Sequence, residues 1–237
     1  MFLDKVLFIS CAAGICTALG AVLLFIKRDW SNRSLAIFLG LASGVMVAVV
    51  ILDMLPSAII FSGYKKAFLG ILIGMMLLAL FDKLVFKQFS SSDTLISLGY
   101  LIMLGIAMHD LPEGMAIALG DELKGRTGMV IALGIGIHNI PEGMAIAAPL
   151  IMGGMSRLKI LRQTLLVGLI TPLGTILGKL ALVVLPQLLP LLLGIASGIM
   201  IYLVIFQLWP EAGMKGQRSR WIGFAAGFVI IFIATFF

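Results

Sequence analysis

The chain has 237 residues, of which 61% are hydrophobic and 12% are charged, and its formal net charge is +6 at pH 7. Soluble domains are about 45–50% apolar and about 25% charged, so this composition excludes a soluble fold of this size. The basic residues stand in short clusters between long apolar runs, which is typical of segments that flank membrane spans and excludes a nucleic-acid-binding face.

The long apolar runs predict an all-α membrane protein. A spanning helix needs about 20 apolar residues, and cuts at the polar segments leave eight such stretches. The first has no small-residue cleavage site before a polar chain, so it is predicted to be a span and not a removed signal peptide. No connecting segment is long enough for a soluble domain, so residues 1–237 are predicted to form a single polytopic transmembrane domain. The eight predicted spans are residues 6–26, 35–60, 67–86, 95–119, 129–150, 164–185, 188–210 and 221–237.

The distribution of Lys and Arg predicts the orientation in the membrane. The segments after the first, third, fifth and seventh spans hold 11 of these residues, whereas the N-terminus and the other connecting segments hold 5. Positively charged loops stay in the cytoplasm. Both termini are therefore predicted to lie outside the cytoplasm, in a multi-pass protein of the cell membrane.

Two internal repeats organise the chain. LGIAMHDLPEGMAIA (104–118) in the fourth span and LGIGIHNIPEGMAIA (133–147) in the fifth agree at 11 of 15 positions. A second pair joins GLASGVMVAVVILDMLPSA (40–58) in the second span to GIASGIMIYLVIFQLWPEA (194–212) in the seventh. The two copies of each pair run in opposite directions across the membrane. This predicts an inverted repeat of spans 1–3 and 6–8 around the central spans 4 and 5, which is typical of secondary transporters.

The repeated phrase places two His–Glu pairs inside the membrane. His109 and Glu113 are four residues apart, as are His138 and Glu142, so each pair lies on one face of its helix. At 1.5 Å per residue all four fall within a slab about 10 Å thick. The two imidazoles and two carboxylates are therefore predicted to converge on one metal ion between facing helices.

Asp110 and Asn139 follow the two histidines and point about 100° away from them. They are predicted to form a second, oxygen-rich site that shares the two glutamates. A charge at mid-membrane costs at least about 2.5–3.5 kcal/mol. Neither helix has a Lys or Arg between its ends, so a bound cation, protons or water must offset the three carboxylates.

Two prolines and the ligand types refine this prediction. Pro112 and Pro141 lack the N–H groups that would bond the carbonyls of Met108 and Ile137, and kinks there are predicted to open room for water and an ion. Nitrogen and carboxylate ligands without thiolate suit Zn²⁺ and its first-row neighbours. The thioether of Met46 is a weaker candidate ligand, because it is one of 14 methionines.

With these residues the chain resembles the ZIP (Zrt/Irt-like) family of divalent metal transporters, in particular its bacterial GufA-type branch. The resemblance covers nearly the whole chain and rests on the eight spans, the paired HxxPEG phrase and the SGVM…DxLP stretch of the second span. It implies a transport site between spans 4 and 5 that moves between the two sides by relative motion of helix bundles. On matching positions it implies primary ligands His109, Glu113, His138 and Glu142 with Met46 as a neighbour, and an adjacent site of Asp110, Asn139 and the same glutamates.

Two departures from the family pattern concern the adjacent site. The fourth span reads HDLPEG where the family usually has Asn after His, which adds a negative charge. The sixth span reads GLITPLG, with Thr171 where many members have a glutamate. The sequence leaves open whether this site still holds a metal.

Two carboxylates outside the central spans are candidates for the transport pathway. Asp53 lies near the outer end of the second span and Glu211 near the inner end of the seventh, close to matching positions of the repeat. They could attract a cation on entry and receive it on exit, or they could simply be interfacial residues. Lys179, inside the sixth span, has only a snorkelling interpretation.

The expected function is a secondary carrier that moves divalent metal ions towards the cytoplasm, Zn²⁺ first and otherwise iron, manganese or cadmium. The metal would be cargo, with no separate cofactor and no catalytic residue, and proton exchange could be coupled to it. The alternative is an intramembrane zinc-dependent hydrolase, but each helix offers HxxxE and not the HExxH of a zinc protease. The expected partners are divalent metal ions and the lipid bilayer, without nucleic acid, and a homodimer is left open.

Overall fold

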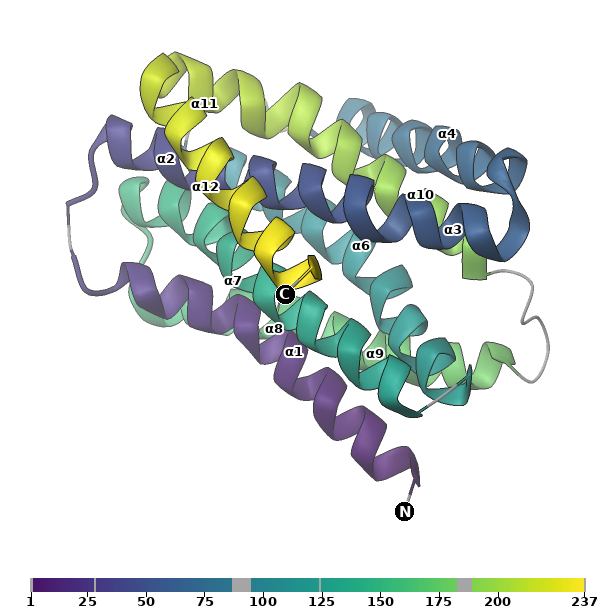
Figure 1. Ribbon diagram of the computed structural model, residues 1–237. Coiled ribbons are helices and arrows are strands. Elements are labelled where there is room, and N and C mark those ends of the chain that lie inside the picture. The colour runs from purple at the N-terminus through teal and green to yellow at the C-terminus, as the bar shows by residue number, and fades with distance from the viewer. Residues whose placement is uncertain (1, 28, 87–94, 124, 183–188, 237) are drawn as a thin grey trace.

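The computed structural model describes residues 2–27, 29–86, 95–123, 125–182 and 189–236. Within these ranges the chain is helical and forms no strand. Eight of the described helices are long and apolar enough to cross a membrane, and they run along broadly the same direction (Figure 1). The predicted all-α membrane architecture is confirmed.

Four of the spans are single helices and four are built from joined segments. The single helices are α1 (Phe2–Leu24), α6 (Leu95–Leu123), α7 (Gly125–Met152) and α12 (Gln217–Phe236). The second span joins α2 (Asn32–Val49), a π-helical turn (Val50–Met54) and α3 (Leu55–Ser62), and the third joins α4 (Tyr64–Phe81) to a π-helical turn (Asp82–Phe86). The sixth joins α8 (Arg157–Gly168) to α9 (Ile170–Leu182), and the seventh joins α10 (Leu189–Leu203), a π-helical turn (Val204–Leu208) and α11 (Trp209–Lys215).

The largest difference from the predicted spans is the start of the sixth, where α8 begins at Arg157 and not at residue 164. Ser156 just before it has an extended backbone, with φ −67° and ψ 141°. The basic segment RLKILRQ continues the helix because Lys and Arg can extend their charged ends beyond the hydrocarbon layer. Polar residues therefore mark the edge of the hydrocarbon layer more reliably than the end of a helix.

The two halves of the inverted repeat share a backbone feature as well as sequence similarity. The π-helical turns Val50–Met54 and Val204–Leu208 occupy equivalent positions, 154 residues apart, and each precedes a proline, Pro56 or Pro210. The residue after each turn donates its N–H to the carbonyl five positions before it. Such a widened turn absorbs the hydrogen bond that proline cannot make.

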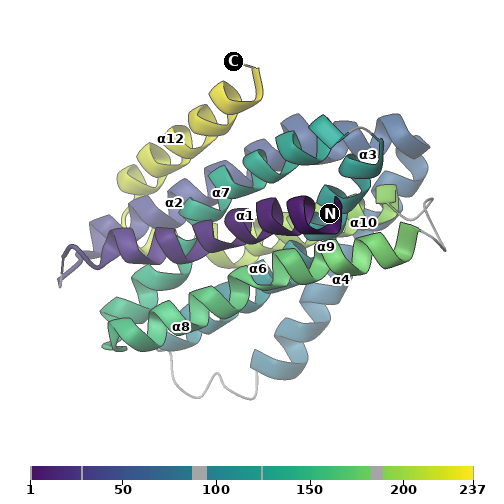
Figure 2. The ribbon, with the colours of Figure 1, turned by 90° about the horizontal axis from the view of Figure 1, so that it is seen from below.

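The helices pack in two groups, and the repeat exchanges helices within each group. We call α1, α6, α7, α8 and α9 the first bundle, and α2, α3, α4, α10, α11 and α12 the second bundle. In the first, α1 packs on α7 and α9 on α6; in the second, α12 packs on α2 and α4 on α10. Each pairing in one half of the repeat thus has an equivalent in the other half. Figure 2 shows α12 at the outer edge of the molecule, where only 17% of its most apolar stretch is buried.

Glycines set the close contacts of the second bundle. A Cβ added to Gly44 of α2 would collide with the Phe224 carbonyl of α12, and one added to Gly198 of α10 would collide with the Ile71 carbonyl of α4. Gly44 and Gly198 are equivalent residues of the repeat. Small residues at helix interfaces let backbones approach closely inside a membrane. The second bundle is therefore held by repeat-related backbone contacts.

Candidate metal centre

The six polar residues of the repeated phrase are all buried in the interior of α6 and α7. The exposed fraction of each is 3% or less. They are His109, Asp110, Glu113, His138, Asn139 and Glu142. The structure thus buries every residue of the two predicted sites on the central helices.

Each histidine faces the glutamate of the other helix. His138 Nε2 lies 3.1 Å from Glu113 Oε2, and His109 Nε2 lies 3.3 Å from Glu142 Oε1. The spacing of four residues within each helix placed the ligands on one face, but the contacts that join them run between helices. A single ion held by these four side chains would therefore bind α6 to α7.

The ring of His109 is oriented by its own helix. Its Nδ1 lies 3.0 Å from the carbonyl oxygen of Gly105. A carbonyl oxygen can only accept, so Nδ1 carries the proton and donates it. Nε2 then faces Glu142 and Asp110, whose Oδ1 is 3.6 Å away. A ring nitrogen that is fixed in this way is the usual arrangement for an imidazole that binds a metal.

Most of the oxygen atoms in the cluster lack a hydrogen-bond partner among the described residues. These atoms are both carboxylate oxygens of Asp110, both of Glu142, Oε1 of Glu113 and Oδ1 of Asn139. His109 Nε2 is also without a hydrogen bond, although Glu142 is close. Buried polar atoms without a partner are costly, and buried carboxylates more so. The cluster therefore requires positive charge, supplied by a cation or by protons.

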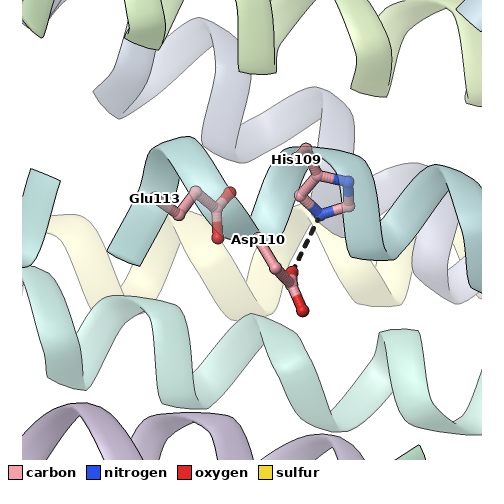
Figure 3. A group of neighbouring side chains, drawn as sticks. All are labelled: His109, Asp110 and Glu113. Carbon is pink, nitrogen blue, oxygen red and sulfur yellow. Dashed lines mark ion pairs between the residues drawn. The ribbon is translucent and has the colours of Figure 1, made fainter. Parts of the chain in front are cut away.

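The geometry on α6 alone is already compact. One ligand atom each from His109, Asp110 and Glu113 can be chosen so that all three lie within 4.8 Å of one another. Figure 3 shows the three side chains leaving neighbouring turns of α6, with the Asp110 carboxylate turned towards the His109 ring. A donor set of imidazole nitrogen and carboxylate oxygen suits Zn²⁺ and other first-row divalent ions.

Asn139 has a contact that the sequence did not predict. Its Nδ2 donates to the carbonyl oxygen of Ala13 in α1, at 3.0 Å. The amide nitrogen is thus engaged with the backbone of a neighbouring helix, and only Oδ1 remains for an ion. Asp110, at the equivalent position of α6, has no N–H to donate and keeps both oxygens free of hydrogen bonds among the described residues.

The two central prolines do not break their helices. α6 is α-helical on both sides of Pro112, and α7 on both sides of Pro141. The widened turns that accompany Pro56 and Pro210 have no counterpart at these two positions. The suggested kinks at Pro112 and Pro141 stay a prediction.

The weaker candidates lie on the second and seventh spans, outside the central helices. Met46 is fully buried in the same apolar core as its repeat partner Met200, and its role as a ligand stays a prediction. Asp53 lies in the π-helical turn of the second span, where its Oδ1 accepts a hydrogen bond from Ser57 Oγ at 3.5 Å. Glu211 forms an ion pair with Lys215 at 3.3 Å.

Two further charged residues, Lys179 and Asp82, have partners on other spans. Lys179 Nζ lies 3.8 Å from Asp121 Oδ2, so the sixth span is paired with the end of α6 and the lysine needs no snorkelling. Gln207, which is the repeat equivalent of Asp53, donates to Asp82 Oδ2 at 3.0 Å, and Tyr202 donates to the same oxygen at 2.9 Å. The role of Asp82 is not visible in the sequence, because its partners come from a distant span.

Comparisons with known proteins agree with this geometry. A family model described as ZIP zinc transporter matches residues 87–235. The chain is 32% identical to zinc transporter ZupT of Chlorobaculum parvum, over 96% of each chain. It is 31% identical to zinc transporter ZTP29 of Arabidopsis thaliana, over 89% of this chain and 86% of the relative. It is also 31% identical to ZupT of Corynebacterium glutamicum, over 94% of each.

The family model covers more than half of the chain, and its matched region contains both copies of the repeated phrase and the whole His/Glu cluster. The full-length relatives extend the match to the first three spans. The protein therefore belongs to the ZIP zinc transporter family.

Proposed function

We propose that this protein is a secondary transporter that carries divalent metal ions, Zn²⁺ before others, across the membrane towards the cytoplasm through the cluster on α6 and α7. The observation that carries the proposal is the pair of crossed His–Glu contacts, at 3.1 and 3.3 Å, buried inside two adjacent spans. No Lys or Arg is buried among the described residues, which supports a cation site at these three carboxylates over a structural salt bridge.

The residues have distinct roles in this proposal. His109 and His138 bind the ion through Nε2, and Glu113 and Glu142 bind it from the opposite helices. The two glutamates are shared with an adjacent position that Asp110 and the Oδ1 atom of Asn139 supply. Metal ligands must be deprotonated, so protons leave the cluster when an ion enters and return when it departs. Exchange of this kind would couple metal transport to proton movement.

The packing of the two bundles supports a mechanism for crossing the membrane. Within each bundle, glycines bring helix backbones into direct contact, as at Gly44 and Phe224. Between the bundles, Gly105 of α6 instead faces the side chain of Leu203 in α10. Apolar side chains slide past one another more easily than interlocked backbones. The first bundle, which contains the site, would move as a unit against the second bundle.

The topology and assembly complete the proposal. With an even number of spans both termini lie on one side of the membrane, and the excess of Lys and Arg in the odd-numbered loops supports a position of that side outside the cytoplasm. Asp53 would meet the ion on entry and Glu211 on exit. The membrane is the cell membrane, and a homodimer remains open.

The hydrolase alternative is not favoured. A zinc protease needs two histidines and a general base on one helix. Here each helix offers one histidine, and each imidazole lies against the carboxylate of the other helix. Both the family membership and this geometry favour transport over hydrolysis.

Uptake of radioactive zinc into proteoliposomes under an inward gradient tests the proposal. The native protein should take up zinc with saturation, and His138→Ala/Glu142→Ala should abolish uptake. Glu122→Gln is the matched control, because Glu122 is an exposed carboxylate at the end of the same helix as Glu113. Specific zinc binding by the native protein with no flux under any gradient would reject the carrier.

A further inference from the structure

Three connections of the chain lie at one end of the molecule and carry most of its described Lys and Arg residues. They join α1 to α2, α7 to α8 and α11 to α12, and both ribbon views place them at the left end (Figures 1 and 2). We call the described residues of 25–33, 153–162 and 211–221 the basic end. Its cations are Lys27, Arg33, Arg157, Lys159, Arg162, Lys215, Arg218 and Arg220. The acids described there are Asp29 and Glu211, and Glu211 is already paired with Lys215, so this end has a large excess of positive charge.

Exposed apolar side chains stand directly beside these cations. They are Ile26, Leu158, Met214 and Trp221, with exposed fractions of 86%, 77%, 75% and 56%. Each is next in the sequence to a Lys or an Arg of the basic end. A surface in water gains nothing from exposed apolar side chains, whereas a surface at the boundary between hydrocarbon and headgroups uses apolar and cationic side chains together. The basic end therefore has the composition of a lipid-facing surface.

Aromatic rings hold three of the cations in place. Lys27 Nζ lies 5.5 Å from the centre of the Trp30 ring, and the guanidinium carbon of Arg157 lies 5.9 Å from the centre of the Phe25 ring. Arg220 lies over an aromatic ring in the same way, at 4.0 Å. Every contact of this kind among the described residues belongs to a cation of the basic end. A ring orients a cation without neutralising its charge, so the charge stays available to an anion.

The basic end extends over both bundles. Arg157 of α8 meets the end of α1 within the first bundle. Trp30, in the connection to the second bundle, has its ring 5.0 Å from that of Phe38 in α2. Gly216 lies against α2 as well, since an added Cβ would be 3.6 Å from that of Ala36. A layer of ligands across this end would therefore contact both bundles at once.

The opposite end of the molecule has a different distribution of charge. Lys65 and Lys66 are exposed at the start of α4, which lies at the right end in Figure 1. Lys179 is paired with Asp121 at 3.8 Å, and Glu122 is an exposed acid. Basic and acidic side chains are thus mixed at that end. The excess of cations is therefore a property of the basic end and not of the whole surface.

We propose that the basic end binds anionic phospholipids across both bundles, with the lipid phosphates against its cations and the acyl chains against its exposed apolar side chains. This partner lies beyond the proposed zinc transport and does not depend on it. In the proposed orientation the basic end faces the cytoplasm, the side on which membranes display anionic lipids. A zwitterionic lipid offers the same acyl chains without net negative charge, so it should bind much more weakly.

Thermal unfolding of the full-length protein in uncharged detergent, with phosphatidylglycerol added in steps, tests the proposal. The midpoint should rise with the lipid concentration and saturate, because a ligand that binds only the folded state stabilises it. Phosphatidylcholine with the same acyl chains should raise the midpoint much less. The effect of phosphatidylglycerol should also weaken from about 0.1 M to about 1 M salt, because the screening length falls from about 10 Å to about 3 Å.

Two double substitutions, one in each bundle, locate the bound lipid. Arg157→Gln/Lys159→Gln removes two exposed cations of the first bundle, and Arg33→Gln/Arg218→Gln removes two of the second. Each Lys or Arg near an anionic lipid surface strengthens binding about fivefold, so each double variant should need about twentyfold more phosphatidylglycerol for half of the full effect. Elution as a single species on size exclusion verifies folding, and if one variant does not fold, the other still tests lipid binding from its own bundle.

Lys65→Gln/Lys66→Gln is the matched control, because it removes two neighbouring exposed cations at the opposite end. Its apparent affinity for phosphatidylglycerol should equal that of the native protein. Equal stabilisation by the two lipids, or an equal loss of affinity in the control and in the variants of the basic end, overturns the proposal. A loss confined to one of the two bundles overturns the binding of lipid across both. The proposed function fails on a different result, namely zinc uptake that survives His138→Ala/Glu142→Ala.

Discussion

The two bundles differ in what they do with buried polar groups. Among the residues that the structure describes, the second bundle fully buries the side chains of Ser43 and Ser197, and each bonds a carbonyl of its own helix, Leu39 or Leu193. The first bundle buries all the other polar side chains of this kind, including every residue of the His/Glu cluster.

This difference indicates that the second bundle supports the fold, whereas the first bundle holds the groups that can bind a metal. The second bundle satisfies the hydroxyls of Ser43 and Ser197 within their own helices and closes its interfaces through glycines. The first bundle leaves carboxylate, amide and hydroxyl oxygens unpaired at its centre. Such a region is complete only with a ligand, because unpaired buried polar groups oppose folding. Substitutions in the second bundle should therefore lower the stability of the fold, and substitutions in the first should lower the affinity for metal.

The largest effect on stability should come from Gly198→Leu. The new Cβ would collide with the Ile71 carbonyl, so α10 and α4 would have to separate. We expect a loss of about 3 kcal/mol or more, visible as reduced yield and a lower midpoint of thermal unfolding in detergent. Gly134→Ala is the control, since no atom lies within 4 Å of its added Cβ. A Gly198→Leu protein of native stability would contradict the interlocked second bundle.

Glu113→Gln should produce the largest effect on metal affinity. It removes the carboxylate that faces His138 at 3.1 Å while keeping the side-chain shape. Loss of an outer hydrogen-bond partner in metal sites costs about 10- to 100-fold, so loss of a direct ligand should weaken zinc binding by more than about a hundredfold. Calorimetric titration with zinc measures this, with Glu122→Gln as the control. Equal affinities for the two variants would remove Glu113 from the site.

Zinc itself should stabilise the protein through the first bundle. A ligand that binds only the folded state stabilises it by about 2.7 kcal/mol at 100 times its Kd. The thermal midpoint of the native protein should therefore rise with zinc concentration. That of His138→Ala/Glu142→Ala should stay constant, and a rise of equal size in both proteins would indicate that the stabilising zinc binds elsewhere.

The smallest effect is expected for Ser43→Ala and Ser197→Ala. Each hydroxyl bonds only a carbonyl of its own helix, so removing it should cost about 1 kcal/mol or less. The two costs should match, because the residues are equivalent in the repeat. Chemical unfolding of both variants measures them, with zinc uptake unchanged. A severe loss of uptake in either would place polar chemistry in the second bundle.

The features of this protein that can be predicted from its sequence depend on local geometry. Spacings such as His109 to Glu113 place side chains on one face of any helix, whatever surrounds it. Eight apolar runs of sufficient length leave a chain little choice except helices across a membrane. The repeated phrases, the fold class and the choice of His and Glu as candidate ligands follow from such local rules.

Contacts between distant segments needed the tertiary structure. The crossing of His109 with Glu142, the hydrogen bond from Asn139 to Ala13 and the pairing of Lys179 with Asp121 join residues on different spans. The start of α8 at Arg157 and the widened turns before Pro56 and Pro210 also departed from expectation, because they depend on how each span meets its surroundings.

Thr17 illustrates both what the sequence predicts and what only the tertiary structure decides. The sequence contains the signal, since T-x-L-G recurs 154 residues later, but a threonine in an apolar helix usually bonds its own backbone. Only the tertiary structure brings Asn139 to the Ala13 carbonyl and Gly143 against Thr17, leaving the hydroxyl without a partner among the described residues. Sequence alone determined which helices form and which ligands they display, because both follow from local periodicity and hydrophobicity. Tertiary packing decided which polar atoms are satisfied, because a hydrogen bond between spans depends on how the helices are placed against one another.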